Sequence, residues 1–418
     1  MSRLDELIAE LCPDGVEYRT LGEVCSFKYG YTASAADTGN ARFVRITDIG
    51  EDGLLKSTSP KYVDIEEDNR EYMLSEGDIL VARTGATFGK TLLVRTDSPA
   101  IYASYLMRLC FDQKKVLNSF YWHYAKSAMY WEQAVKLVQG GGQPQFNANV
   151  MKRIRIPVPP LEIQREIVRI LDNFTALAAA LAEELQARKK QYEYYRDLLL
   201  SYDEEGNPRM AGGQKAVWMT LGDVCGVTKL AGFEFTEHVR YVDEGEIIAL
   251  RALNIKKGLL DLTNVRFIDG SNFTKLSRSK LYINDLLFTY VGTVGEVALV
   301  DANDRYYLAP NVARIRFATE RVSPEFMRHY FQCSEFIVNQ IGKYMESSSM
   351  KNLSMENIRK FLIPIPPLAE QERIVAILDR FDALVNDISS GLPAEIEARR
   401  KQYEYYRDQL LTFQEKQG

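Results

Sequence analysis

The sequence predicts an α+β protein with an internal repeat, in which two globular mixed α/β domains are separated by two long antiparallel coiled-coil helices related by a pseudo-two-fold. Two observations lead to this prediction. The octapeptide KQYEYYRD stands at 190–197 and again at 401–408, although it has no low-complexity character. The segment in front of each copy carries apolar residues at heptad spacing, which is typical of a coiled coil.

The repeat extends over the whole chain. Further segments recur in the same order, at offsets that grow from 200 to 211 residues. They are TLGEVC (20–25) with TLGDVC (220–225), loosely GDILVARTGATFG (77–89) with NDLLFTYVGTVG (284–295), IPVPPL (156–161) with IPIPPL (363–368), and LDNFTAL (171–177) with LDRFDAL (378–384). A period of this length is too long for a solenoid, so the chain is a duplicated two-part unit.

The part of each unit that matches closely predicts a long helix after a proline run, because proline does not continue a strand ladder or a helix interior. From Leu161 to Leu200 such a helix would span on the order of 60 Å at about 1.5 Å per residue. Its heptad core positions, broken only at Arg188, are Ile167, Leu171, Phe174, Ala178, Leu181, Leu185, Tyr192, Tyr195 and Leu199.

The second helix carries four more residues than the first. Its core positions are Ile374, Leu378, Phe381, Val385 and Ile388, and the segment SSGLPAEI follows them. We expect a break at Gly391 and a restarted helix with Pro393 in its first turn. A continuous helix with a stutter is the alternative.

The middle of each unit diverges and matches only at a few framework points. Short runs of strand-forming residues alternate with Gly, Asp and Asn turns, as in RFVRITDI, DILVAR and TLLVRT. Each middle then carries an aromatic helix-like stretch, a small polar loop and a basic step into the prolines. These features predict an α+β domain of roughly 150 residues in each unit.

The chain ends close the pattern. LDELIAELCPDGVEYRTLGEVC resembles RDLLLSYDEEG followed by VWMTLGDVC, so the N-terminus looks like the tail of a helix whose body lies at the C-terminus, and the termini should be close. The predicted parts are an N-terminal helix (1–17) that completes the C-terminal repeat, a first domain (18–155), a central helix (156–205), a second domain (206–362) and a C-terminal helix (363–418).

Composition narrows the class of protein. The net charge of −5 argues against a histone-like nucleic-acid binder and leaves local basic patches possible. The five cysteines are scattered with no CxxC pair, so neither a zinc site nor a disulfide framework is expected, and a reducing, cytoplasmic location fits. The charged start does not resemble a signal peptide, and no apolar run approaches the roughly 18 residues of a membrane span.

The stretch RTGATFGKT is one residue short of a phosphate-binding P-loop, and Glu296 replaces Lys90 in the second copy. We therefore expect a hairpin turn that glycine permits, with a DNA-facing loop as the alternative. His123 and His329 lie in the aromatic helix-like stretches and are predicted to be packed. The chain shows no serine-hydrolase or metalloprotease motif.

The proline runs also lack the Asn or Asp before Pro-Pro, and the aromatic residue after it, that an amino-methyltransferase needs. We interpret them as segments that mark the start of each long helix. A self-sufficient DNA methyltransferase is opposed by this absence and by the missing Gly-rich cofactor motif.

The order of divergent domain, IPVPPL, LDNFTAL, long helix and KQYEYYRD, followed by the same again, resembles the specificity subunit of type I restriction–modification systems over essentially the whole chain. The resemblance implies two target-recognition domains, near 18–155 and 215–362, each reading one half of a bipartite site in double-stranded DNA. The helices would fix the gap between the halves and dock two methyltransferase subunits, and restriction–translocation subunits would join that core.

The resemblance also implies a non-catalytic chain that binds no cofactor itself, within a complex that uses S-adenosylmethionine, ATP and Mg. Because DNA affinity depends on local phosphate neutralisation, part of the positive charge should come from the partner subunits. The main rival is a coiled-coil scaffold protein with two globular heads and no nucleic-acid role.

Candidate DNA contacts combine basic side chains with amides suited to adenine edges. They are Arg42, Arg45, Arg83, Thr84, Lys90, Gln143, Gln145, Asn147 and Asn149 in the first domain, and Arg251, Lys256, Lys257, Lys351 and Asn352 in the second. In the repeated octapeptide the tyrosines could simply pack between helices. Packing alone would not require identical residues away from the heptad core, so the candidate partner contacts are Gln191, Tyr194, Arg196, Gln402, Tyr405 and Arg407.

Overall fold

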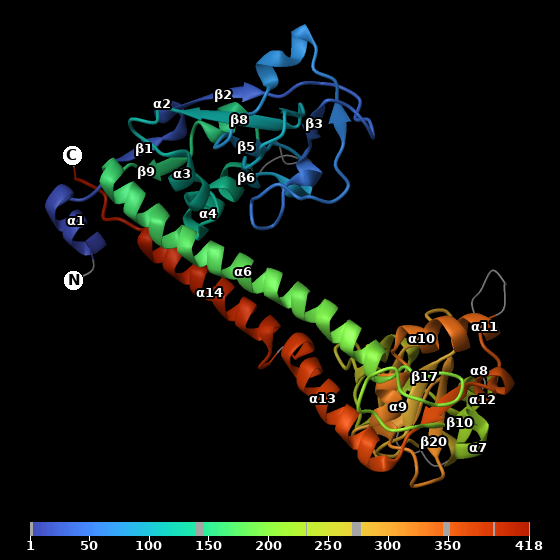
Figure 1. Cartoon of the computed structure of the whole chain (residues 1–418). Coiled ribbons are helices and arrows are strands. Elements are labelled where there is room, and N and C mark those ends of the chain that lie inside the picture. Colours follow the sequence, from blue (N-terminus) through green and yellow to red (C-terminus); the bar gives the residue numbers. More distant parts are fainter. Residues whose placement is uncertain are drawn as a thin grey trace. The chain divides into compact units, whose positions relative to one another are not determined.

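The computed structural model describes residues 3–138, 146–230, 232–269, 277–345, 352–387 and 389–417. The chain divides into two compact units (Figure 1). The first unit comprises residues 1–182 and 395–418, and the second unit comprises residues 183–394. Over the described ranges, no helix combines the length and the apolar character needed to cross a bilayer.

The first unit holds a four-stranded antiparallel sheet in the order β2-β8-β5-β6 and a three-stranded sheet in the order β4-β3-β7. In the smaller sheet β3 pairs with β7 in parallel, and β1 and β9 form a separate antiparallel ribbon. The strands are β1 (Tyr18–Thr20), β2 (Cys25–Tyr29), β3 (Ala41–Val44), β4 (Tyr62–Val63), β5 (Ile79–Ala82), β6 (Thr91–Leu93), β7 (Ala100–Tyr102), β8 (Leu106–Phe111) and β9 (Arg155–Pro157).

The second unit repeats this topology with additions, since its smaller sheet has four strands instead of three and two further strands form a separate ribbon. Its antiparallel sheet has the order β11-β20-β17-β18, its second sheet the order β12-β16-β13-β19 with β13 and β19 parallel, and β10 pairs with β21. The strands are β10 (Val217–Thr220), β11 (Cys225–Lys229), β12 (Tyr241–Val242), β13 (Ile247–Leu250), β14 (Ile255–Lys256), β15 (Leu259–Leu260), β16 (Phe267–Ile268), β17 (Leu286–Thr289), β18 (Val297–Leu299), β19 (Tyr306–Leu308), β20 (Val312–Phe317) and β21 (Leu362–Ile365). The matching strand orders confirm the α+β class and the duplication.

Both units also contain short helices, and the two sets are similar but not identical. The first unit has α1 (Arg3–Leu11), α2 (Leu21–Val24), α3 (Asn118–Tyr124), α4 (Ala128–Val138) and α5 (Ala148–Met151), with 3-10 turns η1 (Ile46–Asp48), η2 (Glu67–Tyr72) and η3 (Gly85–Thr87). The second has α7 (Leu221–Val224), α8 (Gly232–His238), α9 (Pro324–Tyr330), α10 (Ser334–Phe336), α11 (Gly342–Tyr344) and α12 (Met355–Arg359), with 3-10 turns η4 (Ala252–Asn254) and η6 (Ser277–Ser279) and a π-helical turn η7 (Ile337–Ile341).

The repeated TLG(E/D)VC motif is the step from the ribbon strand into a short helix. Thr20 donates from its backbone N–H and its hydroxyl to Glu23 Oε2, at 2.7 and 2.6 Å. Thr220 does the same to Asp223 Oδ2, at 3.3 and 2.6 Å. The acidic residue three positions on therefore serves the helix start in each copy, as in a capping box.

The long helices are α6 (Leu161–Leu199), α13 (Leu368–Asn386) and α14 (Leu392–Leu410). Both proline runs end a ribbon strand and lead directly into a helix, which confirms that they mark helix entries. In the first unit, the start of α6 shares a core with the end of α14, through Ile163, Leu171 and Leu411. In the second unit, the end of α6 packs on α13 through Leu199, Ile374 and Leu378. The paired helices are thus antiparallel within each unit.

The second long helix is broken where the sequence predicts it. α13 ends at Asn386, α14 begins at Leu392, and Pro393 lies in the first turn of α14. A Cβ on Gly391 would stand 2.5 Å from the carbonyl oxygen of Ala383, so only glycine allows this approach. The break accounts for the four extra residues. Ile388 lies outside the described residues.

The chain ends are close, as expected, but the N-terminal helix is not the tail of α14. The Val16 N–H donates to the Gln414 carbonyl at 2.8 Å, and the Lys416 N–H donates to the Val16 carbonyl at 2.9 Å. α14 ends at Leu410, and α1 is a separate helix that buries Leu4 in the same core as Leu411. In the second unit the corresponding stretch after α6 forms turns.

Candidate nucleic-acid interface

A buried glutamine fastens each long helix to its globular part. The Gln164 side chain donates to the carbonyls of Lys115 (2.7 Å) and Pro159 (2.8 Å) and accepts from the Leu117 N–H (2.9 Å). Gln371 makes the same set with Arg321 (2.7 Å), Pro366 (2.8 Å) and Ser323 (2.8 Å). Both amides are fully buried and satisfied, so they fix the helix start relative to the loop that precedes α3 or α9.

The tyrosine at the third position of the octapeptide takes part in a second link between the long helices and the globular part of each unit. His123 Nε2 lies 3.0 Å from Asp172 Oδ1 of α6, and its Nδ1 lies 3.0 Å from the Tyr403 hydroxyl of α14. The neutral tautomer with hydrogen on Nε2 satisfies both contacts, since it donates to the carboxylate and accepts from the phenol. We call this set the first helix junction: Tyr403, His123 and Asp172.

The second unit carries the same arrangement, the second helix junction: Tyr192, His329 and Asp379. His329 Nε2 lies 2.8 Å from Asp379 Oδ1, and its Nδ1 lies 3.5 Å from the Tyr192 hydroxyl. Arg328 also donates to Asp379 at 2.6 Å. Both histidines are fully buried, which confirms that they are packed.

Burial sets the charge state of both junctions. It lowers the pKa of His123 and of His329 below the ordinary 6.5, because an imidazolium would lose its hydration there. The hydrogen bond from His123 lowers the pKa of Asp172. Burial would raise the pKa of Asp379, but the His329 hydrogen bond and the nearby Arg328 charge outweigh it and that pKa is lowered. At neutral pH each junction is therefore a neutral imidazole against a carboxylate.

Other octapeptide residues also have partners inside their own unit. Arg196 lies over the Tyr192 ring and 3.3 Å from Asp197, whose carboxylate accepts from the Ser334 N–H at 3.1 Å. Their copies in the first unit pair in the same way, with Arg407 at 2.8 Å from Asp408.

The glutamines Gln191 and Gln402 accept from Arg188 and Arg399, at 2.9 and 3.1 Å. Folding alone therefore gives a reason for identity at these positions away from the heptad core. Of the candidate partner contacts, Tyr194 and Tyr405 are the ones with large exposed surfaces, at 64% and 62%. The partner roles of all six residues stay predictions.

The segment between Gly85 and Gly89 is a hairpin connection and not a phosphate loop. β5 and β6 pair antiparallel around it, and the two glycines adopt φ of 71° and 79°. Gly292 and Gly295 adopt φ of 78° and 99° at the equivalent turn. These left-handed conformations favour glycine, which explains why both copies keep the pair.

The candidate DNA contacts of the first unit fall into different settings. Arg42 donates to the Lys56 carbonyl, and Arg45 is paired with the buried Asp48 at 2.9 Å. Thr84 and Lys90 are half-buried beside the hairpin. Asn147 caps α5 by accepting from the Val150 N–H at 3.1 Å, and Asn149 is exposed on that helix. Gln143 and Gln145 lie outside the described residues.

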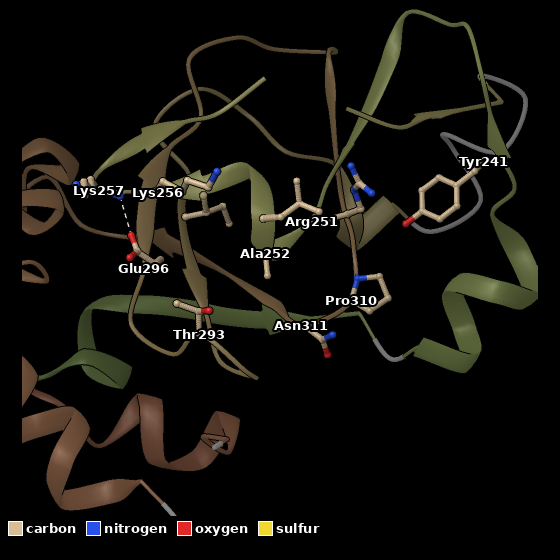
Figure 2. A pocket seen from close by; sticks show the side chains of 11 residues that line it. Tyr241, Arg251, Ala252, Lys256, Lys257, Thr293, Glu296, Pro310 and Asn311 are labelled. Atoms are coloured by element: carbon tan, nitrogen blue, oxygen red, sulfur yellow. Dashed lines mark hydrogen bonds between the residues drawn. The ribbon is translucent and has the colours of Figure 1, made fainter. Parts of the chain in front are cut away.

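Three candidates of the second unit line one pocket of about 750 Å³ (Figure 2). Arg251 stands with Tyr241 at one end, while Lys256 and Lys257 lie at the other end near Glu296. The remaining lining residues are Ala252, Leu253, Ile255, Thr293, Pro310 and Asn311. The pocket therefore has one arginine at one end and, at the other end, two lysines together with an acidic side chain.

The remaining candidates of the second unit, in and near the pocket, have different partners. Lys256 pairs with Asp261 at 2.6 Å. Glu296 accepts the backbone N–H of Lys257 at 2.6 Å. Asn352 is half-buried, and its backbone pairs with that of Val291 in an isolated antiparallel bridge. Lys351 lies outside the described residues.

Arg45 and Arg251 hold equivalent positions, and their environments differ in charge. Each precedes a 3-10 turn, and its backbone N–H donates to the side chain three residues on, Asp48 at 2.7 Å or Asn254 at 3.2 Å. Asp48 neutralises Arg45, whereas Arg251 donates to the neutral Asn264 at 2.8 Å. The second unit therefore presents a cation at this position where the first unit presents an ion pair.

Comparison with known families identifies the family to which these features belong. The model of the type I restriction modification DNA specificity domain matches residues 13–188 and again residues 216–398. The chain belongs to this family. It is a type I specificity subunit with two target-recognition domains, one in each unit, and its role is DNA-sequence specificity.

Relatives match along most of their length. The chain is 29% identical to the EcoR124I/EcoR124II type I restriction enzyme specificity subunit of Escherichia coli, over 99% of this chain and 97% of the relative. It is 29% identical to the putative specificity subunit S.HindORF215P of Haemophilus influenzae, over 83% and 86%.

Solved structures show the same fold. A structure from work on complex assembly of the type I R-M system aligns with a TM-score of 0.60 at 18% identity, over 96% of this chain and 98% of the other. The S subunit of M. genitalium aligns with a TM-score of 0.54 at 14% identity, over 95% and 96%.

Sequence reasoning missed residues that the strands bring to the candidate surface. They are Tyr29, Tyr105, Tyr241, Thr293 and Asn311. The described residues contain no group of three His, Cys, Asp or Glu side chains that could hold a metal ion. Aligning the divergent middles strand by strand would have found part of the missed set, because it pairs position 105 with 311 and position 29 with 229.

Proposed function

We propose that each target-recognition domain reads one half of a bipartite DNA site, and that the two reading surfaces act independently. The observation that carries this proposal is the duplication of framework with divergence of surface. The strand order of the four-stranded antiparallel sheet, the capping motif, the buried glutamine and the helix junction are the same in both units. The residues at the pocket and at the strand ends differ, as two readers of different sequences require.

We further propose that the helices set the gap between half-sites and dock two methyltransferase subunits, with restriction–translocation subunits joining this core. The E. coli relative is described as a restriction enzyme specificity subunit, which supports this assembly. The candidate docking residues are the exposed Tyr194 and Tyr405.

In this proposal the chain has no catalytic activity of its own. S-adenosylmethionine, ATP and Mg would be used by the partner subunits. The absence of a methyltransferase tetrapeptide, a P-loop and a hydrolase motif from the sequence supports this division of work. Methyl transfer by the purified chain, free of partner subunits, would contradict it.

The test is methylome sequencing of a host that carries the methyltransferase partner with and without this chain. We expect methylated adenines in a bipartite motif only when the chain is present. A scaffold protein with no nucleic-acid role would leave the methylated positions unchanged.

A further inference from the structure

Three chain positions meet at the ends of the central strands in each unit. We call them the strand-end cluster: Tyr29, Arg83 and Tyr105 in the first unit, and Lys229, Tyr290 and Asn311 in the second. The Arg83 N–H donates to the Tyr105 carbonyl at 3.1 Å, and the Tyr290 N–H donates to the Asn311 carbonyl at 3.2 Å. The backbone framework is thus the same in both clusters.

At two of these positions the side-chain types are interchanged between the two units. In the first unit the guanidinium of Arg83 lies 5.0 Å from the Tyr29 ring centre and 5.8 Å from that of Tyr105. In the second unit the central residue is the ring, since Lys229 Nζ lies 5.9 Å from the Tyr290 ring centre. Cation and aromatic ring have changed places between equivalent positions.

The first cluster is presented outward. Tyr29 and Tyr105 are 44% and 56% exposed, whereas Tyr290 is 9% exposed. A tyrosine with half of its surface in water gains little from packing. Two such rings around one arginine therefore suggest a surface that a ligand covers.

The guanidinium of Arg83 is anchored by one hydrogen bond, and only part of its donor capacity is engaged. Its Nε donates to the Ser104 carbonyl at 2.9 Å, and the two tyrosine rings lie on either side of this anchored group at 5.0 and 5.8 Å. Within the described part of the chain, its terminal Nη1 and Nη2 donate to no acceptor. A fixed guanidinium with two parallel donors left over matches the O6 and N7 acceptors of guanine in the major groove.

We propose that Arg83 reads a guanine in the half-site of the first domain, and that Tyr29 and Tyr105 are positioning residues for it. This inference rests on the proposed function. The Tyr29 hydroxyl accepts from the Ala148 N–H at 3.2 Å, so that ring is itself tied to α5. A phosphate contact would need the charge alone and not a group held in one plane, and it would carry no sequence information.

The test uses the assembled complex of this chain with its methyltransferase subunits, and maps methylated adenines on a random-sequence DNA library. Arg83→Ala is expected to lower the preference for guanine at one position of one half-site by about tenfold or more. The other half-site and the gap stay as they are. Arg83→Gln, whose amide pairs with adenine edges, is expected to move that position away from guanine.

The positioning role has its own readout. Tyr105→Ala is expected to lower the preference for guanine at the same position without changing the other positions. Tyr105→Phe is expected to keep that preference, because the ring and not the hydroxyl lies beside Arg83. A structural role alone would weaken all sequences equally and would not single out one base.

Two outcomes overturn the inference. Equal weakening of all sequences by Arg83→Ala, with a smaller salt dependence, shows a phosphate contact. An unchanged motif shows that Arg83 contacts no base. If Arg83→Ala does not assemble, Arg83→Gln and Tyr105→Ala supply the same readout. Failure of the proposed function looks different, since the unaltered complex would then methylate without any dependence on this chain.

Discussion

The two helix junctions and the two strand-end clusters hold equivalent places in the two units, yet only the junctions have kept their chemistry. Tyr403, His123 and Asp172 in one unit match Tyr192, His329 and Asp379 in the other, residue for residue. At the strand ends, by contrast, Arg83 is replaced by Tyr290. The attachment of a domain to its helices is therefore what the duplication preserved, and the side chains at the strand ends are what changed.

The long helices offer the first way to test this comparison, because α6 is continuous while α13 and α14 are separated by a break. Inserting four residues after Leu181 adds about 6 Å and turns the downstream part by only about 40°. We expect it to lengthen the unspecified gap by one or two base pairs, at about 3.4 Å each, with both half-sites unchanged. Mapping of methylated adenines measures the gap.

A two-residue insertion at the same place is the matched control with the larger effect. It turns the downstream helix by about 200° and moves Leu185, Tyr192 and Tyr195 off the packed side. Assembly with the methyltransferase subunits should be lost, as measured by size-exclusion chromatography. An active four-residue variant with an unchanged gap would show that α6 docks partners and does not measure distance.

The arginine pair Arg45 and Arg251 separates stability from binding. Arg45→Ala leaves the buried carboxylate of Asp48 without its cation, so we expect the free energy of unfolding to fall by about 1–3 kcal/mol. Arg251→Ala removes no ion pair, so we expect weaker DNA binding with a smaller change in stability. Urea unfolding and a DNA-binding isotherm on both variants decide it. Equal losses of stability would mean that Asp48 and Asn254 act alike.

The tyrosines of the helix junctions test how alike the two fastenings are. Tyr403→Phe removes a 3.0 Å hydrogen bond to His123, and we expect a loss of about 1 kcal/mol in the free energy of unfolding. Tyr192→Phe removes a 3.5 Å contact to His329 and should cost less. Denaturant unfolding of both variants gives the comparison, and a larger loss for Tyr192→Phe would reverse the ranking.

Protonation should weaken both junctions together. The folded chain holds His123 and His329 at a pKa below 6.5, whereas the unfolded chain binds these protons near that value. The unfolded state thus binds more protons just below pH 6.5, and stability falls as the pH drops from there toward the folded pKa. Unfolding midpoints at pH 7.5 and 5.5 should differ less for His123→Asn and His329→Asn than for the unaltered chain. An equal pH dependence would contradict the buried neutral imidazoles.

Local signals in the sequence were sufficient to predict the long helices, their entry points and the break in the second one. Proline stops, heptad spacing and the Gly391 break depend on neighbouring residues alone, and the structure confirms them. The junctions depend on contacts between His123 and residues 49 and 280 positions away, which no periodicity shows. For the same reason the burial of the polar Gln164 side chain could not be predicted from the sequence.

The strand-end clusters were out of reach for a further reason. Arg83 could be named from its charge, but Tyr29 and Tyr105 join it only through the β2–β8–β5 pairing, which is non-local. The N-terminal helix shows the opposite error. Sequence similarity suggested a continuation of α14, whereas residues 3–11 form the separate helix α1, whose Leu4 packs in the same core as Leu411.

The central claim is that the two domains read DNA independently on a duplicated framework. The most direct measurement replaces residues 18–155 with the corresponding domain of the E. coli relative and maps methylated adenines in cells that carry the matching methyltransferase. The account predicts that one half of the motif changes while the other half and the gap stay the same. A change in both halves, or in the gap alone, would contradict it.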